Sequence, residues 1–186
     1  SHRSAALLHG WEVKTVPDLP DVMVRAKRHL TQEQRDGVEP HWSDLAAHEV
    51  HLGVTTVERT LADCLRSLPF DEALAIADSA LRHRSISKSR LVEIAAGLRG
   101  RGAAQARRVA AEGTHLAANP FESVARAISL EVSGLALEAQ VVIRDSTGTR
   151  ACGPGRSGAA TGRGVRVALV ALAPGRAAEG LQAVHE

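Results

Sequence analysis

The first part of the chain, residues 1–54, carries only short apolar patterns. An apolar stretch at 4–9 is followed by a glycine, which predicts a short helix that stops there. Small apolar side chains recur at every second position of 22–26, which is the period of a strand. A second extended piece is predicted at 50–54, with an Asp-Gly turn at 36–37 between the two. We therefore expect a small strand-containing α+β region here.

The pattern changes to that of helices at Thr55. Thr55 and Glu58 match the S/T-x-x-E capping box that opens a helix, and apolar residues then recur every three or four positions through Leu68. Further helices are predicted to begin near three residues: Asp71, Ser87 and Gly102. Because the loops between them are short, we expect a helical region of antiparallel neighbours over 55–118.

A clear helix start opens the segment 119–150. Asn119 suits an N-cap, Pro120 the first turn, and Glu122 the third helical position of a capping box. We expect three apolar residues of this helix to face inward: Val124, Ala127 and Ile128. A strand is predicted at 135–143, with a turn after it. Helix followed by strand is typical of the beginning of a mixed α/β domain.

The last segment, 151–186, differs from the rest in composition. It contains nine Ala and seven Gly but no Asp, Lys, Asn or Ile. Such bias is typical of a low-complexity linker, although the apolar run at 165–172 argues against one. We expect an irregular tail.

Composition sets outer limits on the kind of protein. The 186 residues are 44% apolar, which suffices for one domain or two small ones, but aromatic residues are scarce. No run approaches the roughly 18 apolar residues of a membrane helix, and no secretory region follows the start, so we expect no membrane partner. Cys64 and Cys152 have no metal or redox spacing, which favours free thiols in a reducing cytoplasm.

Positive charge is concentrated between residues 82 and 108. The whole chain has a net charge of only +2, yet this stretch holds eight cations against one carboxylate, Glu93. Such a stretch can bind phosphates through counterion release, and a solvated helical face is the alternative interpretation. We predict six candidate DNA contacts: Arg84, Lys88, Arg90, Arg101, Arg107 and Arg108.

Three histidines, His41, His48 and His51, lie close to acidic residues and could suggest a metal site. The predicted strand would place His48 and His51 on opposite faces, so we favour surface or capping roles and assign no metal ligand. The chain also lacks a G-x-S-x-G nucleophile turn and a Walker A loop, which argues against a serine hydrolase and a P-loop nucleotidase.

Five segments follow one another in an order that is more specific than any of them alone. They are SHRSAALLHG at 1–10, VTTVERTLAD at 54–63, LPFDEAL at 68–74, DSALR at 78–82 and PFES at 120–123. Together they resemble an actinobacterial family of AbiEi-type antitoxins that carry a C-terminal Vsr-like endonuclease domain. The resemblance covers residues 1 to about 149. It implies a winged helix before Ser1, a middle region like this one, and a truncated restriction-endonuclease-like α/β stub over 119–150.

By the same resemblance, Glu122 is the helical carboxylate of a metal-dependent nuclease site. Such sites gather carboxylates around a divalent ion that activates water. The partners of Glu122 should fall in the tail, where the only carboxylates are Glu179 and Glu186. A capping role is the alternative for Glu122. We therefore expect no cofactor and no cleavage, with Mg²⁺ needed only if nuclease activity is retained.

A slipped reading frame near Arg150 would explain the tail. In the alternative frame, 155–158 permits Ala-Asp-Leu-Val, 165–168 permits Phe-Glu-Trp-His, and 179–184 permits Arg-Asp-Cys-Lys-Arg-Tyr. These resemble, in order, segments of the family's nuclease domain. Sequencing the gene tests this frameshift hypothesis, since an intact frame through codon 150 would end it.

These observations lead to one expected function and two alternatives. We expect a cytoplasmic, DNA-associated antitoxin or transcriptional regulator whose nuclease domain is degenerate. One alternative is a protein-interaction module that binds a cognate toxin. The other is a metal-dependent DNA endonuclease.

Overall fold

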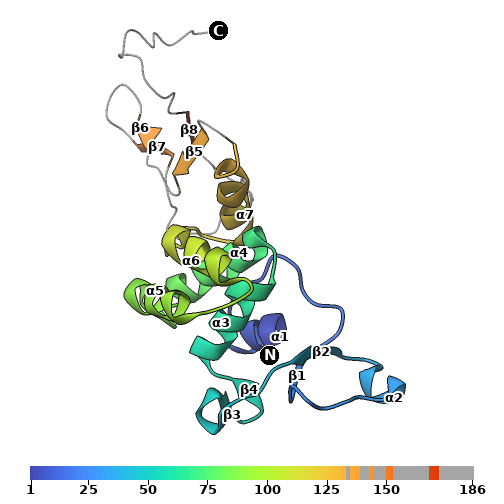
Figure 1. Cartoon of the computed structure of the whole chain (residues 1–186). Coiled ribbons are helices and arrows are strands. Elements are labelled where there is room, and N and C mark those ends of the chain that lie inside the picture. The colour runs from blue at the N-terminus through green and yellow to red at the C-terminus, as the bar shows by residue number, and fades with distance from the viewer. Residues whose placement is uncertain (133–134, 139–142, 145–149, 153–167, 172–186) are drawn as a thin grey trace.

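The computed structural model describes residues 1–132 and four short backbone stretches, 135–138, 143–144, 150–152 and 168–171. Within these ranges the protein is α+β with a predominance of helix. Figure 1 shows a helical body from which a two-stranded ribbon projects on one side, with α7 at one end and the β3–β4 hairpin at the other. None of the helices in the described ranges is both long and apolar enough to cross a bilayer.

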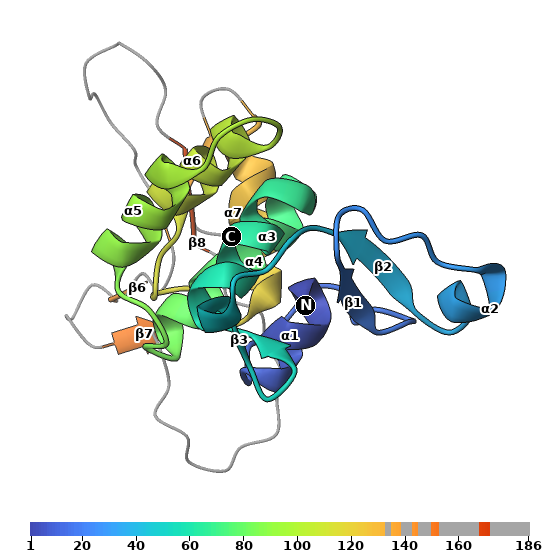
Figure 2. The ribbon, with the colours of Figure 1, turned by 60° about the horizontal axis from the view of Figure 1, so that its bottom comes forward.

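The ribbon forms from residues that are distant in sequence. After helix α1 (His2–Leu8), strand β1 (Asp21–Val24) pairs in parallel with β2 (Glu39–Trp42), and the short helix α2 (Gln32–Arg35) lies in the crossover. The predicted helix and first strand are confirmed, whereas β2 and α2 were not predicted. Strand β2 contains Pro40, which a two-stranded sheet tolerates because each strand has one unpaired edge. Figure 2 shows the ribbon standing apart from the helices.

The extended piece predicted at 50–54 is wrong as a single strand. It is a hairpin of β3 (Val50–His51) and β4 (Val54–Thr55), preceded by the 3₁₀ turn η1 (Ala47–Glu49). Leu52 and Gly53 both have positive φ, at 48° and 79°, as a two-residue turn between antiparallel strands requires. The glycine therefore reverses the chain where the alternation of apolar residues suggested that it continues.

Four helices form the body of the protein, as predicted from the apolar spacing. They are α3 (Val57–Ser67), α4 (Phe70–Arg82), α5 (Lys88–Gly97) and α6 (Ala103–Glu112). The predicted start of α3 is off by one residue, because Thr56 is the N-cap and Thr55 instead ends β4 with its hydroxyl 2.7 Å from that of Thr60. Ser87 caps α5 as predicted.

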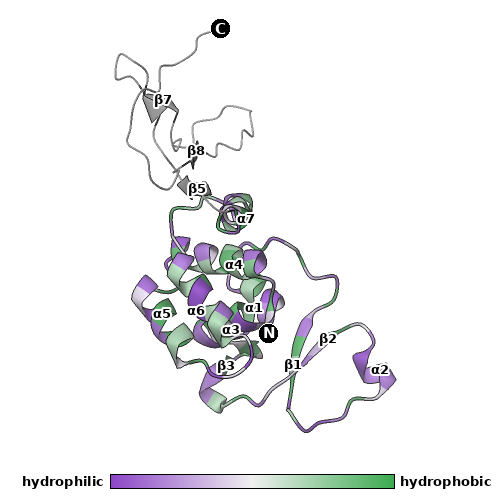
Figure 3. Ribbon diagram, turned by 45° about the horizontal axis from the view of Figure 1, so that its top comes forward, coloured by the Kyte–Doolittle hydropathy of each residue, from purple (hydrophilic) through white to green (hydrophobic). Residues whose placement is uncertain are grey.

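Helix α4 is the centre of the core. Every residue from Ala73 to Leu81 is buried, and α4 packs against α3, α6 and α7. Small alanines on several sides allow this close approach, and a helix that is apolar nearly all round is typically a buried one. Figure 3 shows apolar and polar segments alternating along these helices, as expected where one face is buried. Leu61 and Leu91 complete the contacts from α3 and α5.

Helix α7 (Pro120–Ser129) begins at the predicted cap, since the Oδ1 of Asn119 accepts from the N–H of Glu122 at 3.0 Å. The prediction that Ile128 faces inward is wrong, because Ile128 is 59% exposed while Ala127 is buried. The side of α7 that faces α4 is occupied by Ser123 and Arg126, which bind a buried carboxylate. This polar contact turns the larger apolar side chains outward.

Beyond α7 the structure describes four short strands. Strand β5 (Leu135–Glu138) pairs antiparallel with β8 (Ala168–Ala171), and β6 (Ile143–Arg144) pairs with β7 (Arg150–Cys152). The predicted strand at 135–143 thus corresponds to β5 and β6, and 139–142 lies outside the described residues. The predicted turn after it and most of the predicted irregular tail also lie outside them.

Candidate functional site

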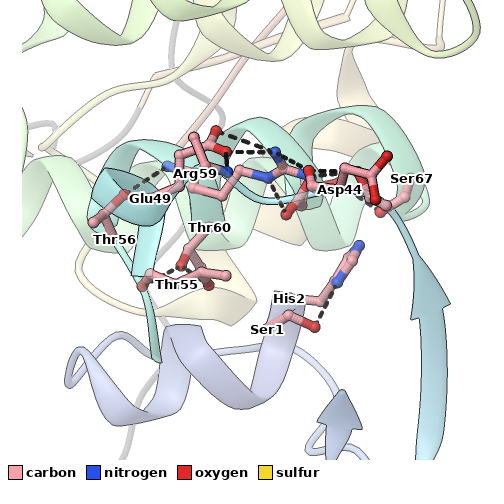
Figure 4. A network of polar contacts seen from close by, with 12 residues as sticks. Ser1, His2, Asp44, Glu49, Thr55, Thr56, Arg59, Thr60 and Ser67 are labelled. Carbon is pink, nitrogen blue, oxygen red and sulfur yellow. Dashed lines mark hydrogen bonds and ion pairs between the residues drawn. The ribbon is translucent and has the colours of Figure 1, made fainter. Parts of the chain in front are cut away.

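Arg59 of α3 fixes the segment between β2 and β3 to the helical body. Its Nε donates to the Oδ2 of Asp63 at 2.9 Å, and its Nη1 donates to both carboxylate oxygens of Glu49. Its Nη2 donates to the hydroxyl of Ser43 at 2.7 Å, and its Nη1 also reaches the carbonyl of Asp44. Figure 4 shows Arg59 in the middle of this network. Because the guanidinium donors are held in one plane, the network orients the chain that leaves β2.

A pair of histidines lies where α1 meets the ribbon. The Nε2 of His41 is 2.7 Å from the Oδ1 of Asp21, and the rings of His41 and His2 stack with centroids 3.7 Å apart. Burial acts to raise the pKa of Asp21, but hydrogen bonds from His41 and the N–H of Ser4 outweigh it, so that pKa is lowered. Burial and the neighbouring His41 lower the pKa of His2 to about 3, so its imidazole is neutral near pH 7.

A cleft of about 740 Å³ opens between this ribbon and the helical body. Its walls come from β2, from the last turn of α3, and from the loop that enters α6. The side chains on which its chemistry depends are His41, Trp42, Asp63, Arg66, Arg101 and Gln105. His2 also lines the cleft, and Figure 4 shows its ring pointing from α1 toward α3.

Two arginines make the wall formed by α3 and α6 positive. The Nη2 of Arg66 donates to the carbonyls of Arg99 and Arg101, at 3.2 and 3.3 Å. Among the described residues no other hydrogen bond of the Arg66 side chain occurs, so its Nε and Nη1 donors remain for a ligand. The side chain of Arg101 is exposed and has no ion pair within the described ranges. The N-terminus of α6 adds partial positive charge to the same wall.

Gly102 allows α6 to begin against the end of α3. Its φ is +79°, and a Cβ at this position would lie 2.1 Å from the carbonyl oxygen of Arg66. Gln105 also connects α6 to the end of α3, because its Nε2 donates to the carbonyls of Leu65 and Leu68 at 3.0 and 2.7 Å. These contacts satisfy the last carbonyls of α3 and hold Arg66 and Arg101 at one wall.

Among the residues that line the cleft, Asp63 carries a carboxylate. Burial raises the pKa of Asp63, although its hydrogen bond with Arg59 acts in the opposite direction. The ion pair with Arg59 neutralises its charge. The local balance at the cleft is therefore positive, through Arg66 and Arg101.

Trp42 is the aromatic residue among those that line the cleft. Its indole N–H donates to the carbonyl of Arg28 at 2.9 Å, and the guanidinium of Arg35 lies 5.5 Å from the ring centroid. The residue is nonetheless 43% exposed. A hydrogen bond at the edge and a cation over one face hold the ring in place, and the exposed part is available for contact.

The structure divides the six predicted DNA contacts between different surroundings. All six are exposed. Arg101 lines the cleft, Arg90 is paired with Glu58 and Glu93, and the guanidinium of Arg108 lies over the ring of Phe70. Within the described part of the chain, Arg107 reaches only the carbonyl of Leu98, at 3.4 Å. The cations of this stretch therefore differ in their partners, since Arg90 and Arg108 are engaged within the fold and Arg101 lines the cleft.

Arg84 and Lys88 lie at the other end of the α5–α6 pair. Lys88 donates to the carbonyls of Ala111, at 2.7 Å, and of Gly113, so its ammonium group binds the end of α6. A second cavity, of about 540 Å³, is lined by Arg84 and Lys88 together with apolar side chains. We call the end of the helix pair that carries Lys88 the Lys88 end (Arg84, Lys88, Arg126). The opposite end, next to the cleft, is the Arg101 end (Arg66, Arg99, Arg101).

A buried carboxylate organises the Lys88 end. Asp78 of α4 is fully buried and accepts from the N–H of Thr114 at 2.7 Å, from the hydroxyl of Ser123 at 2.8 Å and from the Nη1 of Arg126 at 2.9 Å. Burial raises the pKa of Asp78 despite these bonds. Arg126 also donates to the carbonyl of Glu112. The network joins α4, α6 and α7.

Glu122 serves the start of α7. It is 8% exposed, and its Oε2 accepts from the N–H of Ala118 at 2.9 Å. The carboxylate thus binds the backbone N–H of the residue just before the N-cap. This resembles the predicted capping role, in which it would bind the N–H of the N-cap itself. The tail carboxylates Glu179 and Glu186 lie outside the described residues, so the predicted nuclease role of Glu122 stays a prediction.

The three histidines of the metal hypothesis belong to different elements. His41 is paired with Asp21, while His48 belongs to η1 and His51 to β3. Among the side chains that the structure describes, no three His, Cys, Asp or Glu residues come together as a metal site. Cys64 is free and buried, and burial raises the pKa of its thiol.

Comparison with known proteins adds no relative to this description. No protein-family model matches the chain, and no curated protein or solved structure matches it.

The sequence alone did not reveal most of the cleft. Trp42, Arg66 and Asp63 were not among the predicted site residues. The spacing of Arg59 and Asp63, four residues apart on a helix, was a usable signal for one ion pair. Trp42 offered a weaker one, since it is one of only two tryptophans.

Proposed function

We propose that the protein is a DNA-associated regulator and that it binds nucleic acid phosphates through the cleft. The observation that carries this proposal is the joint presence of Arg66, Arg101 and the N-terminus of α6 in one wall, where the carboxylate of Asp63 is already paired. Guanidinium groups are suited to phosphate because their planar donors match its oxygens. Counterion release then supplies much of the affinity.

The proposal includes the family that the sequence resembles. In it, the chain is part of a cytoplasmic AbiEi-type antitoxin, and 119–150 is a degenerate, restriction-endonuclease-like stub. The order of the five matching segments and the succession of α7 and β5 support this assignment. Glu122 then acts as a helix cap, and the protein cleaves no DNA with or without Mg²⁺.

Salt-dependent binding tests this function. A fluorescently labelled oligonucleotide is titrated with protein at several salt concentrations, and the logarithm of the affinity is plotted against that of the salt concentration. We expect a steep decline, and Arg66→Gln should reduce its slope by about 0.7–0.9, the value of one phosphate contact. Arg90→Gln is the matched control, because Arg90 is balanced by Glu58 and Glu93. No binding, or a salt-independent affinity, would contradict the proposal.

A second candidate, binding of a protein such as a cognate toxin, is favoured by the outer face of α7. Phe121 and Ile128 are seven residues apart on α7 and are 61% and 59% exposed, and Val132, just beyond the helix, is 49% exposed. A partner that covered them would bind with little dependence on salt. Adding Mg²⁺ in the DNA assay also tests the third candidate, since strand cleavage that Glu122→Ala abolishes would establish a nuclease.

A further inference from the structure

We infer that the cleft takes an unpaired strand of nucleic acid, with one base stacked on Trp42. The inference rests on the proposed function, because it assumes that Arg66 and Arg101 bind phosphate. It goes further by naming the form of nucleic acid and the residue that contacts the base.

The shape of the site is the first reason. The basic groups lie in a concave cleft of about 740 Å³, between the ribbon and the helices. Clefts of roughly 300–1,000 Å³ hold drug-sized ligands, and a nucleotide unit is in that size class. Duplex DNA is instead read by helices or ribbons that protrude into its grooves. Arg66 and Arg101 lie at the ends of α3 and α6 beside the cleft and not on the projecting ribbon, so they match a strand that enters the cleft rather than a double helix.

The environment of Trp42 is the second reason. Sequence-independent binding of single strands combines a positive groove with aromatic rings on which bases stack. Trp42 is 43% exposed in the same cleft as the two arginines, and its N–H is fixed on the carbonyl of Arg28. Arg35 lies over its ring at 5.5 Å. A base on the other face would complete a stack of base, indole and guanidinium, in which the cation also strengthens the contact.

The two tryptophans allow this contact to be observed directly. Trp11 is 1% exposed and its N–H donates to Ser85, whereas Trp42 is the exposed one. A base stacked on Trp42 should quench its fluorescence, and the signal of Trp11 should stay. Wild type is titrated with an unlabelled oligothymidylate, its ribonucleotide equivalent, and a hairpin duplex of equal charge.

We expect both single strands to bind at least tenfold more tightly than the duplex and to quench the fluorescence. Comparison of the deoxyribonucleotide with the ribonucleotide strand shows whether the sugar contributes to binding. Trp42→Ala should weaken single-strand binding about tenfold, as loss of one stacked base does. Trp42→Phe should keep most of the affinity and lose the quenching, which guards against a folding defect in the alanine variant. Phe121→Ala is the control, because it removes the exposed aromatic of α7.

The possible failures are distinguishable. Equal affinity for duplex and single strands, or unchanged binding by Trp42→Ala, would overturn the inference. If Arg66→Gln still weakened binding in that case, the proposed function would stand. Absence of binding to every oligonucleotide would overturn both.

Discussion

The two ends of the α5–α6 helix pair use their cations in different ways. At the Lys88 end, Lys88 binds carbonyls at the end of α6 and Arg126 binds the buried Asp78, so these charges hold the fold together. At the Arg101 end, Arg66 and Arg101 line an open cleft and keep donors for a ligand. The cations of the basic stretch 82–108, together with Arg66 and Arg126, are thus divided by the fold into structural and accessible charge. Charge density along a chain locates a binding surface only after the internal partners are known.

The largest expected effect is at the Lys88 end, in the variant Asp78→Ala. It leaves Arg126 and the N–H of Thr114 without their partner, and breaking a buried ion pair costs about 3–5 kcal/mol. Urea denaturation measures this loss in the free energy of unfolding. The control is Asp71→Ala, which removes a partly exposed carboxylate of the same helix, paired with the exposed Lys14, and should cost about 1 kcal/mol or less. Equal losses would show that Asp78 does not join α4 to α7.

The second largest effect is expected at the Arg101 end, where α6 begins against the end of α3. Gly102→Ala would place a Cβ 2.1 Å from the carbonyl oxygen of Arg66, so α6 must move away from α3, at a cost of roughly 3 kcal/mol. Gly100→Ala is a matched control, because Gly100 also has a positive φ, of 75°, but nothing within 4 Å of the added carbon. It should cost only the backbone strain, about 1–2 kcal/mol. Thermal unfolding of both proteins gives the comparison, and equal destabilisation would exclude a close approach at Gly102.

A smaller effect is expected from acidification. The pKa of His2 is lowered from 6.5 to about 3 by burial, so below pH 6.5 the unfolded chain binds a proton that the folded one does not. Stability is therefore complete above that pH and is lost as the pH falls, by about 2 kcal/mol near pH 5. His2→Gln should show a smaller loss in urea denaturation, whereas the exposed His48→Gln should behave as wild type. A pH dependence shared by all three proteins would contradict the assignment to His2.

The helices could be predicted from the sequence because their signals are local. Ser87 and Asn119 cap α5 and α7 as expected, and the apolar spacing located the buried faces of α3 and α4. The prediction for Ile128 failed because the orientation of α7 is set by Asp78, a residue of another helix. Spacing within one segment carries no information about a polar contact to a distant one.

The cleft was hidden for the same reason. It joins Trp42 of the ribbon to Arg66 and Arg101 of two helix ends, and the parallel pairing of β1 with β2 that places Trp42 there is not encoded by a hairpin turn. Of the six cations predicted to contact DNA, only Arg101 lines it. The sequence indicated that charge was available, but the internal bonds of Arg90 and Lys88 depend on the folded chain.

The most direct test compares two double variants that remove equal charge from the two ends. Arg66→Gln/Arg101→Gln and Arg84→Gln/Lys88→Gln are each titrated with the same labelled single strand at one fixed salt concentration, after circular dichroism has shown that both are folded. We expect the first to lose affinity at least tenfold and the second to bind nearly as wild type. Equal losses, or a greater loss in the second, would contradict the assignment of phosphate binding to the cleft.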